Sequence, residues 1–276
     1  MKPIAFGWSY YLILLRVDQY AIAQALKIAS CLPCVRLQCV VKGRLTMKEK
    51  FVVTIDGPAG AGKSTVSKAL ARRLSYLYLD TGALYRAFAY KVIQEGILPD
   101  DEKALAALCS RTELHLDNID GSLNVFIDGV NVTKMIRSEE VGLVASKVSA
   151  VSAVRGRLLT IQRNAGERGG IVAEGRDMGT VVFPMADYKF YLDAGVEERV
   201  RRRYSELILQ GVSVDYKTVA GDLLVRDRQD QERKIAPLKA SEDATVVDST
   251  RMSVSEVVEK MISIIKGTCA ISQKRK

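Results

Sequence analysis

The feature that most limits the fold of this chain is a glycine-rich segment. It reads Gly57, Pro58, Ala59, Gly60, Ala61, Gly62, Lys63, Ser64, Thr65. The segment matches G-x-x-x-x-G-K-[ST] and lies between an apolar run at 51–55 and an amphipathic run at 63–74, which predict a strand and a helix. In that context the loop N–H groups and the helix dipole form a phosphate site. We expect Lys63 to neutralise the β- and γ-phosphates of a nucleoside triphosphate and Ser64 to bind Mg²⁺ with it.

Short apolar strands alternate with amphipathic helices along most of the chain after residue 50. Strands are predicted at 51–55, 77–79, 171–173, 189–192 and 245–247, and helices at 63–74, 83–94, 196–209 and 253–265. This alternation predicts a parallel sheet covered by helices on both faces. We therefore expect an α/β fold of the three-layer P-loop NTPase type.

The middle of the chain breaks that alternation. Three short strands are predicted at 113–117, 122–127 and 130–133, and the dipeptides Asp-Gly at 120–121 and 128–129 are typical of the turns between them. An antiparallel meander within a parallel fold indicates an insertion, which we place at about 99–169.

The P-loop predicts a nucleoside triphosphate but not the reaction. No N-K-x-D tetrad of a regulatory GTPase occurs, and 276 residues are too few for a large motor ATPase.

The formal charge of +9 favours polyanionic ligands, and no run reaches the roughly 20 apolar residues of a membrane span. The chain has one histidine, His115, so mechanisms that need several imidazoles are excluded. Apolar and polar residues alternate around His115, which predicts that it is a solvent-facing residue of a strand. A small-molecule kinase fits these limits. It needs a second anion site and a basic segment that closes over the phosphates.

Three segments offer polar side chains for that second site. Residues 80–86 and 174–180 each follow a predicted strand, so their side chains emerge at the carboxyl edge of the sheet, where α/β folds bind ligands. An arginine from each could hold a phosphate bidentately. In the third segment Arg226, Asp230 and Arg233 share one face if residues 226–233 are helical. That segment and the arginines at 199–203 fit either a phosphate-closing lid or a solvated helix with salt bridges.

Together these segments resemble bacterial cytidylate kinase over residues 50–266. The shared phrases are IDGPAGAGKST, LDTGALYRA, EGRDMGTVVFP, RDRQDQERKIAPLK and VVDSTRMSVSEVV. The resemblance implies a nucleoside monophosphate kinase fold with a five-stranded parallel core, an enlarged monophosphate-binding insertion and an arginine-rich helical lid at about 199–235. It implies transfer of the γ-phosphoryl group of ATP to CMP or dCMP, in cytoplasmic pyrimidine metabolism, by a monomer.

The resemblance also implies roles for individual residues. Lys63, Arg176 and Arg226 are the implied catalytic cations, Arg176 is also one of three arginines that hold the acceptor phosphate, and residues 57–65 bind ATP. The other two arginines implied at the acceptor phosphate are Arg86 and Arg137, and the implied cytosine readers are Ser146, Arg155 and Asp177. Asp230 is the implied sugar contact and Arg233 a further lid arginine. Thr81 and Tyr85 are two other residues of the monophosphate site. Glu174 departs from the family, which often has Asp there, and this leaves its role toward the metal open.

The hydrogen-bonding pattern of cytosine fits two of these residues. Asp177 can accept from the N4 amino group, while Arg155 can donate to N3 or O2. Uracil reverses the pattern at positions 3 and 4, so a buried carboxylate would penalise UMP.

The first 46 residues form a leader outside the resemblance, and we assign the kinase domain to 47–276. The leader holds six basic residues, one acid and three of the five cysteines. A signal peptide, an organelle transit peptide and a translation start at Met47 all remain open, and we favour the last. Cys31, Cys34 and Cys39 lack a second CxxC, so we do not expect a metal site there.

Two alternatives to a cytidylate kinase remain. A related kinase would act on another monophosphate or a sugar acid. A nucleotide-responsive RNA-binding protein is allowed by the charge, and its RNA affinity would depend steeply on salt. Once the leader is set aside, however, a charge of only about +4 remains, and aromatic residues do not alternate with basic ones as a stacking platform requires. We therefore expect no nucleic-acid partner.

Overall fold

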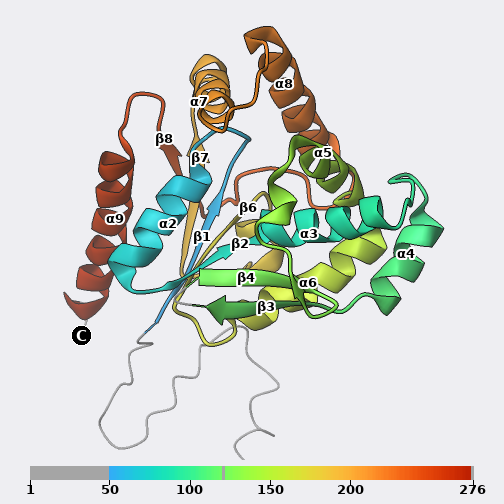
Figure 1. The fold of residues 1–276 in the computed structure, drawn as a ribbon. Helices are drawn as coiled ribbons and strands as arrows, with labels where there is room; N and C mark the ends of the chain where they lie inside the picture. The colour runs from blue at the N-terminus through green and yellow to red at the C-terminus, as the bar shows by residue number, and fades with distance from the viewer. Residues whose placement is uncertain (1–49, 120–121, 275–276) are drawn as a thin grey trace, which may run out of the picture. The chain divides into compact units, whose positions relative to one another are not determined.

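The computed structural model describes residues 50–119 and 122–274. Its centre is one sheet in the order β3-β4-β2-β6-β1-β7-β8, with β5 paired to β4 (Figure 1). Five of these strands, β2, β6, β1, β7 and β8, run parallel. Their bounds are Val52–Asp56 for β1, Leu77–Asp80 for β2, Ile171–Gly175 for β6, Tyr188–Asp193 for β7 and Thr245–Asp248 for β8. The predicted five-stranded parallel core is confirmed.

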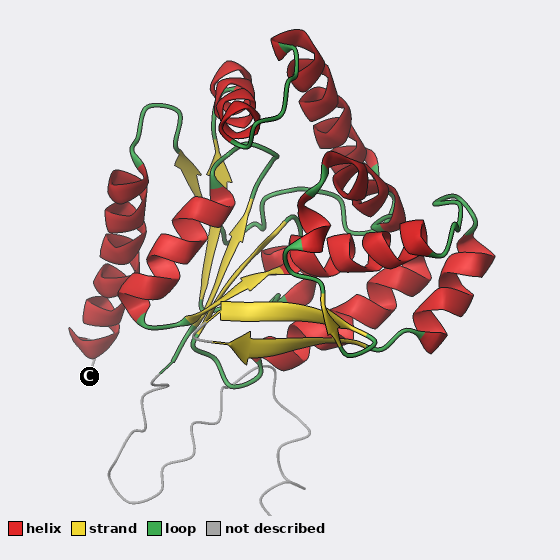
Figure 2. Ribbon diagram, viewed as in Figure 1, coloured by secondary structure: helices red, strands yellow, loops and turns green. Residues whose placement is uncertain are grey.

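Helices cover both faces of this parallel core (Figure 2). On one face α2 (Lys63–Leu74) and α9 (Val254–Lys274) pack Leu70 and Met261 against Ile55 and Phe190. On the other face a π-helical turn, η3 (Met178–Val182), and α6 (Ser152–Gly166) cover Leu79 and Ala173. Every side chain of β1 is buried, as expected of a central strand with helices on both sides. The three-layer α/β class predicted from the sequence is confirmed.

The middle of the chain contains more helix than the sequence patterns indicated. The meander is present as β3 (Leu114–Ile119), β4 (Ser122–Ile127) and β5 (Val130–Asn131), and β4 joins the central sheet by a parallel pairing to β2. Around it lie three helices that were not predicted, α4 (Glu102–Arg111), α5 (Glu139–Val148) and α6. With α3 (Thr81–Gln94) they enclose a core of their own.

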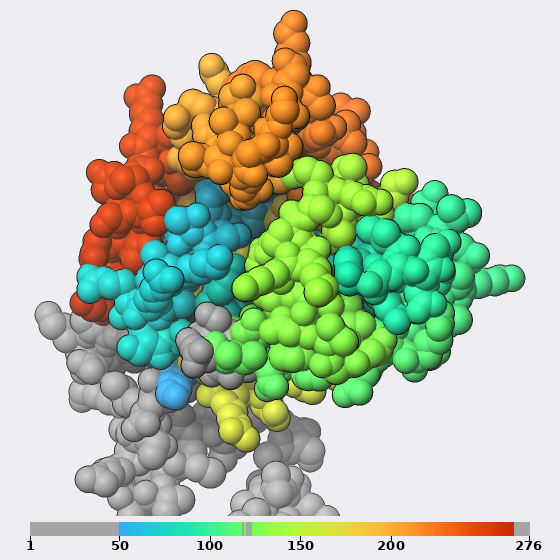
Figure 3. Space-filling model, viewed as in Figure 1, coloured from blue at the N-terminus to red at the C-terminus, as the bar shows by residue number. Residues whose placement is uncertain are grey.

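The segment predicted as a lid consists of two helices, α7 (Val196–Leu209) and α8 (Tyr216–Glu232). Figure 3 shows this region directly above α2 and α5 on the face in view. The prediction that Arg226, Asp230 and Arg233 share one helix face is wrong for Arg233, because α8 ends at Glu232 and Arg233 has an extended backbone. The side chain of Arg233 nevertheless reaches Asp230, at 3.9 Å between Nη1 and Oδ1.

Among the described residues no helix is long and apolar enough to cross a membrane. His115 lies in β3 as predicted, with 41% of its side chain exposed and its ring stacked on Phe126 at 5.1 Å between centroids. The predictions for Cys31, Cys34 and Cys39 fall outside the described residues.

Candidate active site

The P-loop leaves the carboxyl end of β1 and enters α2 at Lys63. Glycine is needed at two of its positions because neighbouring backbone lies too close for a side chain. A Cβ on Gly57, at φ +148°, would stand 2.0 Å from the carbonyl oxygen of Leu192, and one on Gly60, at φ +73°, would stand 2.8 Å from that of Arg199. The loop is therefore held between β7 and the start of the lid.

Lys63 is buried at the base of the P-loop, where its Nζ donates to the carbonyl oxygen of Pro58 at 2.6 Å. Burial, together with the nearby cations Arg176 and Arg226, lowers the pKa of Lys63 to about 7, against the opposing effect of Glu174. A polyphosphate between these cations would restore the charge on Lys63.

The side chains of Ser64 and Glu174 meet beside Lys63. The Ser64 hydroxyl donates to Glu174 Oε1 at 2.7 Å, and the Tyr78 phenol donates to the same oxygen. Glu174 Oε2 is buried without a hydrogen-bond partner, and burial together with the charge of Asp80 raises the pKa of this carboxyl group. A hydroxyl and a carboxylate oxygen with no partner are hard ligands that fit Mg²⁺. No larger cluster of metal-ligating side chains occurs in the described ranges.

The three arginines assigned to the acceptor phosphate form ion pairs with two carboxylates, those of Asp80 and Asp230. Arg86 and Arg137 both approach Asp80 Oδ2, at 3.0 Å and 3.5 Å. Arg176 donates from Nε to Asp230 Oδ2 at 2.7 Å. Attraction to Asp230 raises the pKa of Arg176 despite its burial.

Arg226 is a lid cation whose charge repels those of Lys63 and Arg176. Within the part of the chain that the structure describes, no hydrogen bond or ion pair involves its guanidinium. Burial and, to a smaller extent, repulsion from Arg176 together lower the pKa of Arg226 to about 10. Arg226 thus adds positive charge without an ion-paired carboxylate beside Lys63 and Arg176, which favours a polyanionic ligand.

The residues assigned to the base lie further along the same edge of the sheet. Asp177 forms a buried ion pair with Arg155, and Arg233 Nη2 lies 3.7 Å from the second oxygen of Asp177. The guanidinium of Arg155 stands over the ring of Tyr85, 5.7 Å from its centroid. Asp177 directly precedes η3 and Arg233 directly follows α8, whereas Arg155 lies in α6 and Tyr85 in α3 (Thr81–Gln94). One buried carboxylate among arginines and an aromatic face is suited to an amino-bearing ring.

Two of the predicted CMP-site residues have other contacts. The Ser146 hydroxyl donates to Gln229 Oε1 of α8 at 3.1 Å, and its carbonyl oxygen accepts from Ser149. The Thr81 hydroxyl donates to the carbonyl oxygen of Glu174 at 2.7 Å, which ties the start of α3 to β6. Neither is in hydrogen-bond contact with the Asp177–Arg155 pair. Thr65, the last P-loop residue, is exposed.

Sequence patterns did not identify a second buried pair, Arg199 of α7 with Asp227 of α8. Asp227 Oδ1 accepts the N–H of Ala59 in the P-loop at 3.0 Å, and Arg199 Nη1 donates to the carbonyl oxygen of Ala59 at 2.9 Å. The lid is therefore fastened to the P-loop by both residues. The arginines at 199–203 were expected to belong either to a lid or to a solvated helix face. Arg199 is buried and contacts the P-loop, as a lid residue would. Arg201 is exposed and paired with Glu198, as on a solvated helix face.

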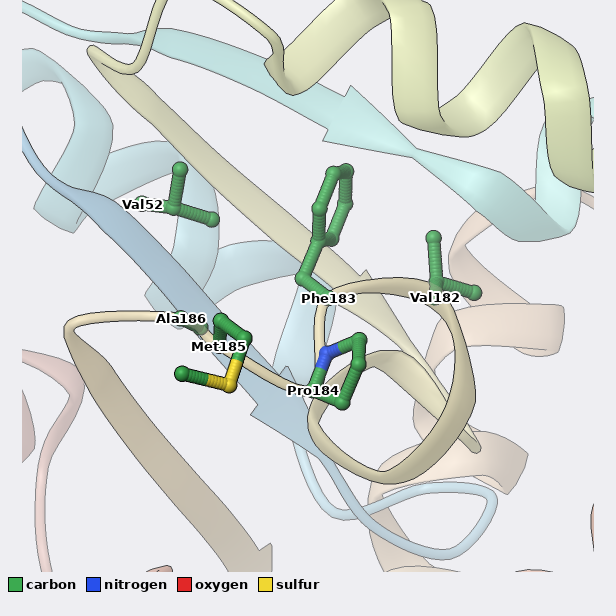
Figure 4. A pocket seen from close by; sticks show the side chains of 6 residues that line it. All are labelled: Val52, Val182, Phe183, Pro184, Met185 and Ala186. Carbon is green, nitrogen blue, oxygen red and sulfur yellow. The ribbon is translucent and has the colours of Figure 1, made fainter. Parts of the chain in front are cut away.

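Two cavities in the described part of the chain lie outside this group of residues. An apolar hollow of about 240 Å³ lies near the start of β1 (Figure 4), lined by Val52, Val182, Phe183, Pro184, Met185 and Ala186. A more polar one of about 380 Å³ lies between Thr180 and Lys239. The functional arrangement consists of charged side chains on strand ends and lid helices instead.

Comparison with known proteins gives one consistent result. The family model described as cytidylate kinase matches residues 53–267. The chain is 44% identical to a cytidylate kinase of Syntrophotalea carbinolica over 79% of its length and 93% of that protein. It is 46% identical to a cytidylate kinase of Geobacter sp. strain M21, over 81% of this chain and 96% of that protein. It is 42% identical to a cytidylate kinase of Bacillus subtilis, over 80% of this chain and 98% of that protein. With a P-loop, a parallel core and paired arginine clusters at its carboxyl edge, this chain belongs to the cytidylate kinase family.

Proposed function

We propose that this protein transfers the γ-phosphoryl group of ATP to CMP or dCMP, giving ADP and CDP or dCDP. The observation that carries the proposal is the buried Asp177–Arg155 pair, which stands on the same sheet edge as the P-loop. Family membership and identities of 42–46% to cytidylate kinases support the same reaction. We place this reaction in cytoplasmic pyrimidine nucleotide metabolism.

The P-loop residues at 57–65 hold the ATP phosphates in this proposal, with Lys63 at the β- and γ-phosphates. Ser64 and the unpartnered oxygen of Glu174 would hold Mg²⁺, which supplies charge neutralisation on the transferring group when it is bound. Tyr78 fixes the other oxygen of Glu174 and so orients the carboxylate.

The acceptor is held by its phosphate and by its base. Arg86, Arg137 and Arg176 exchange their carboxylate partners for the phosphate of CMP, because charge-assisted bidentate contacts favour a dianion. Asp177 accepts from the N4 amino group of cytosine, and Arg155 donates to N3 or O2. Tyr85 and Arg233 border this base site, and Asp230 is assigned to the sugar. Ser146 remains a proposed base contact through its place on α5.

An oxygen of the CMP phosphate attacks the γ-phosphorus in line, and the bond to the β-phosphate oxygen breaks to release ADP. No covalent intermediate with the protein and no general base is required, because the phosphate is largely ionised at neutral pH. Lys63, Arg176 and Arg226 stabilise the charge that spreads over the transferring group. The lid excludes water, which would otherwise accept the phosphoryl group. We propose that the protein acts as a monomer, as the resemblance to the family implies.

A coupled ADP-release assay tests this proposal with ATP, Mg²⁺ and CMP, dCMP, UMP or AMP as the acceptor. Fast turnover with CMP and dCMP, and slow turnover with UMP and AMP, is the expected result. Faster turnover with AMP or UMP than with CMP would overturn the assignment of the base. Turnover with none of the four would overturn the acceptor class and leave only the ATP site.

A further inference from the structure

Asp56 connects the P-loop strand to the loop that carries Asp177. It is the last residue of β1, stands directly before Gly57 and is 5% exposed. Its Oδ1 accepts the N–H of Met178 and its Oδ2 accepts the N–H of Gly179, both at 2.8 Å. One buried carboxylate therefore satisfies the two backbone donors that directly follow Asp177.

One of those donors, the N–H of Gly179 at the second position of the turn, is one that Asp177 would be expected to serve. Asp177 occupies the N-cap position of η3, where an aspartate side chain commonly accepts an N–H from the first turn. Its side chain makes no such hydrogen bond. It pairs with Arg155 instead and faces Arg233. Asp56 thus caps the turn from a different strand, and the carboxylate of Asp177 is available for other contacts.

Close packing holds the turn against β1. A Cβ on Gly179 would lie 3.1 Å from Lys189 Cδ, 3.2 Å from Thr54 Oγ1 and 3.4 Å from Asp56 Oδ2. Only glycine lets the backbone approach Asp56 so closely without displacing these neighbours. The backbone of Asp177, itself 3% exposed, is therefore fixed relative to the P-loop strand.

We propose that Asp56 is a positioning residue for base recognition. By capping η3 in place of Asp177, it keeps the carboxylate of Asp177 directed at the amino group of the acceptor base. This inference rests on the proposed function, because it assumes that Asp177 reads cytosine. It assigns to Asp56 a part in acceptor selectivity, although Asp56 lies beside the ATP loop and does not touch the base.

The charge state of Asp56 is consistent with this role. Burial, with a smaller contribution from Asp177, raises the pKa of Asp56 to about 6, and the N–H groups of Gly179 and Met178 and the charge of Lys63 limit that rise. At neutral pH the group is therefore ionised and both oxygens can accept. Without it, two buried donors would lack partners, and the nearest carboxylate able to replace it is that of Asp177.

The test compares kcat/KM for CMP and for UMP in the wild type, Asp56→Ala and Asp56→Asn. We expect the CMP-to-UMP ratio to fall about tenfold or more in Asp56→Ala, because a misdirected hydrogen-bonding group loses discrimination. The fall should be smaller in Asp56→Asn, whose amide oxygen still accepts one N–H. The KM for ATP should stay within about twofold, since no P-loop N–H depends on Asp56.

A double variant separates positioning from a general structural role. In an Asp177→Asn background, Asp56→Ala should cause no further loss of selectivity, because the carboxylate that it positions is gone. Asp101→Asn is the matched control. Asp101 caps α4 through the N–H of Ala104 at 2.9 Å, away from the base site, and its substitution should leave the ratio unchanged.

Three results would overturn the inference. These are an unchanged CMP-to-UMP ratio in a folded Asp56→Ala protein, an equal loss of kcat/KM for both acceptors, and additive losses in the double variant. If Asp56→Ala does not fold, as judged by circular dichroism, the isosteric Asp56→Asn carries the same comparison. Failure of the wild type to use CMP would instead overturn the proposed function.

Discussion

Removal of the Asp227 carboxylate tests how firmly the lid is fastened to the P-loop. The side chains of Arg199 and Asp227 are 7% and 8% exposed, so their charges are little screened by water. Asp227→Ala leaves the Arg199 guanidinium buried without a counter-ion, which costs about 3–5 kcal/mol of unfolding free energy. Part of that loss, about 1–3 kcal/mol, belongs to the Ala59 N–H that also loses its acceptor. Asp227→Asn keeps an oxygen for that N–H and should therefore lose less than Asp227→Ala.

Urea unfolding followed by far-ultraviolet circular dichroism measures these differences. Asp222→Ala is the matched control, because Asp222 is an exposed acid on the same helix, and its effect should stay within about 0.5 kcal/mol. A loss below about 1 kcal/mol in Asp227→Ala, or one equal to that of Asp222→Ala, would refute the reasoning. Such a result would mean that the ion pair does not hold the lid in solution.

Three further predictions concern the ATP site and the leader. Lys63→Ala should abolish phosphoryl transfer while the circular dichroism spectrum stays that of the wild type, and wild-type turnover would exclude the P-loop assignment. Ser64→Ala should raise the Mg²⁺ concentration that gives half-maximal activity by about tenfold, as expected when a metal-ligand contact is lost. An unchanged Mg²⁺ titration would remove Ser64 from the metal site. Deletion of residues 1–46 should leave kcat and KM unchanged, since the family model begins at residue 53, and a large loss of activity would contradict this.

The parallel core could be predicted because its signals are local. The P-loop fixes a strand before it and a helix after it, and the predicted bounds of α2 and α7 agree with those observed. The middle region was less predictable. Its strands were identified from Asp-Gly turns, whereas α4 and α5 bury few residues each and their signals are the caps Asp101 and Ser138. Those caps are visible in the sequence but were not used.

For the candidate site, the sequence indicates which residue types could perform the chemistry but not which of them are buried. Helical spacing cannot separate Arg199, which is buried, from Arg201, which is solvated, because burial depends on the packing of α8 over α7. Asp56 was missed for a similar reason. Its partners are backbone N–H groups 122 and 123 residues away, and no side-chain pattern reports such contacts.

The sharing of Asp80 by two arginines determines what must happen when an acceptor arrives. Arg86 and Arg137 approach one oxygen of a carboxylate that is fixed at the N-cap of α3, where its other oxygen accepts the N–H of Ala83. An incoming anion must therefore compete with a tethered counter-ion that is present at high effective concentration. A monovalent anion would gain little by this exchange, whereas a phosphate dianion can bridge both guanidinium groups. If Arg86 and Arg137 hold the acceptor phosphate as we propose, Asp80 would act as an electrostatic filter that favours phosphate esters over the chloride and simple carboxylates of the surrounding solution.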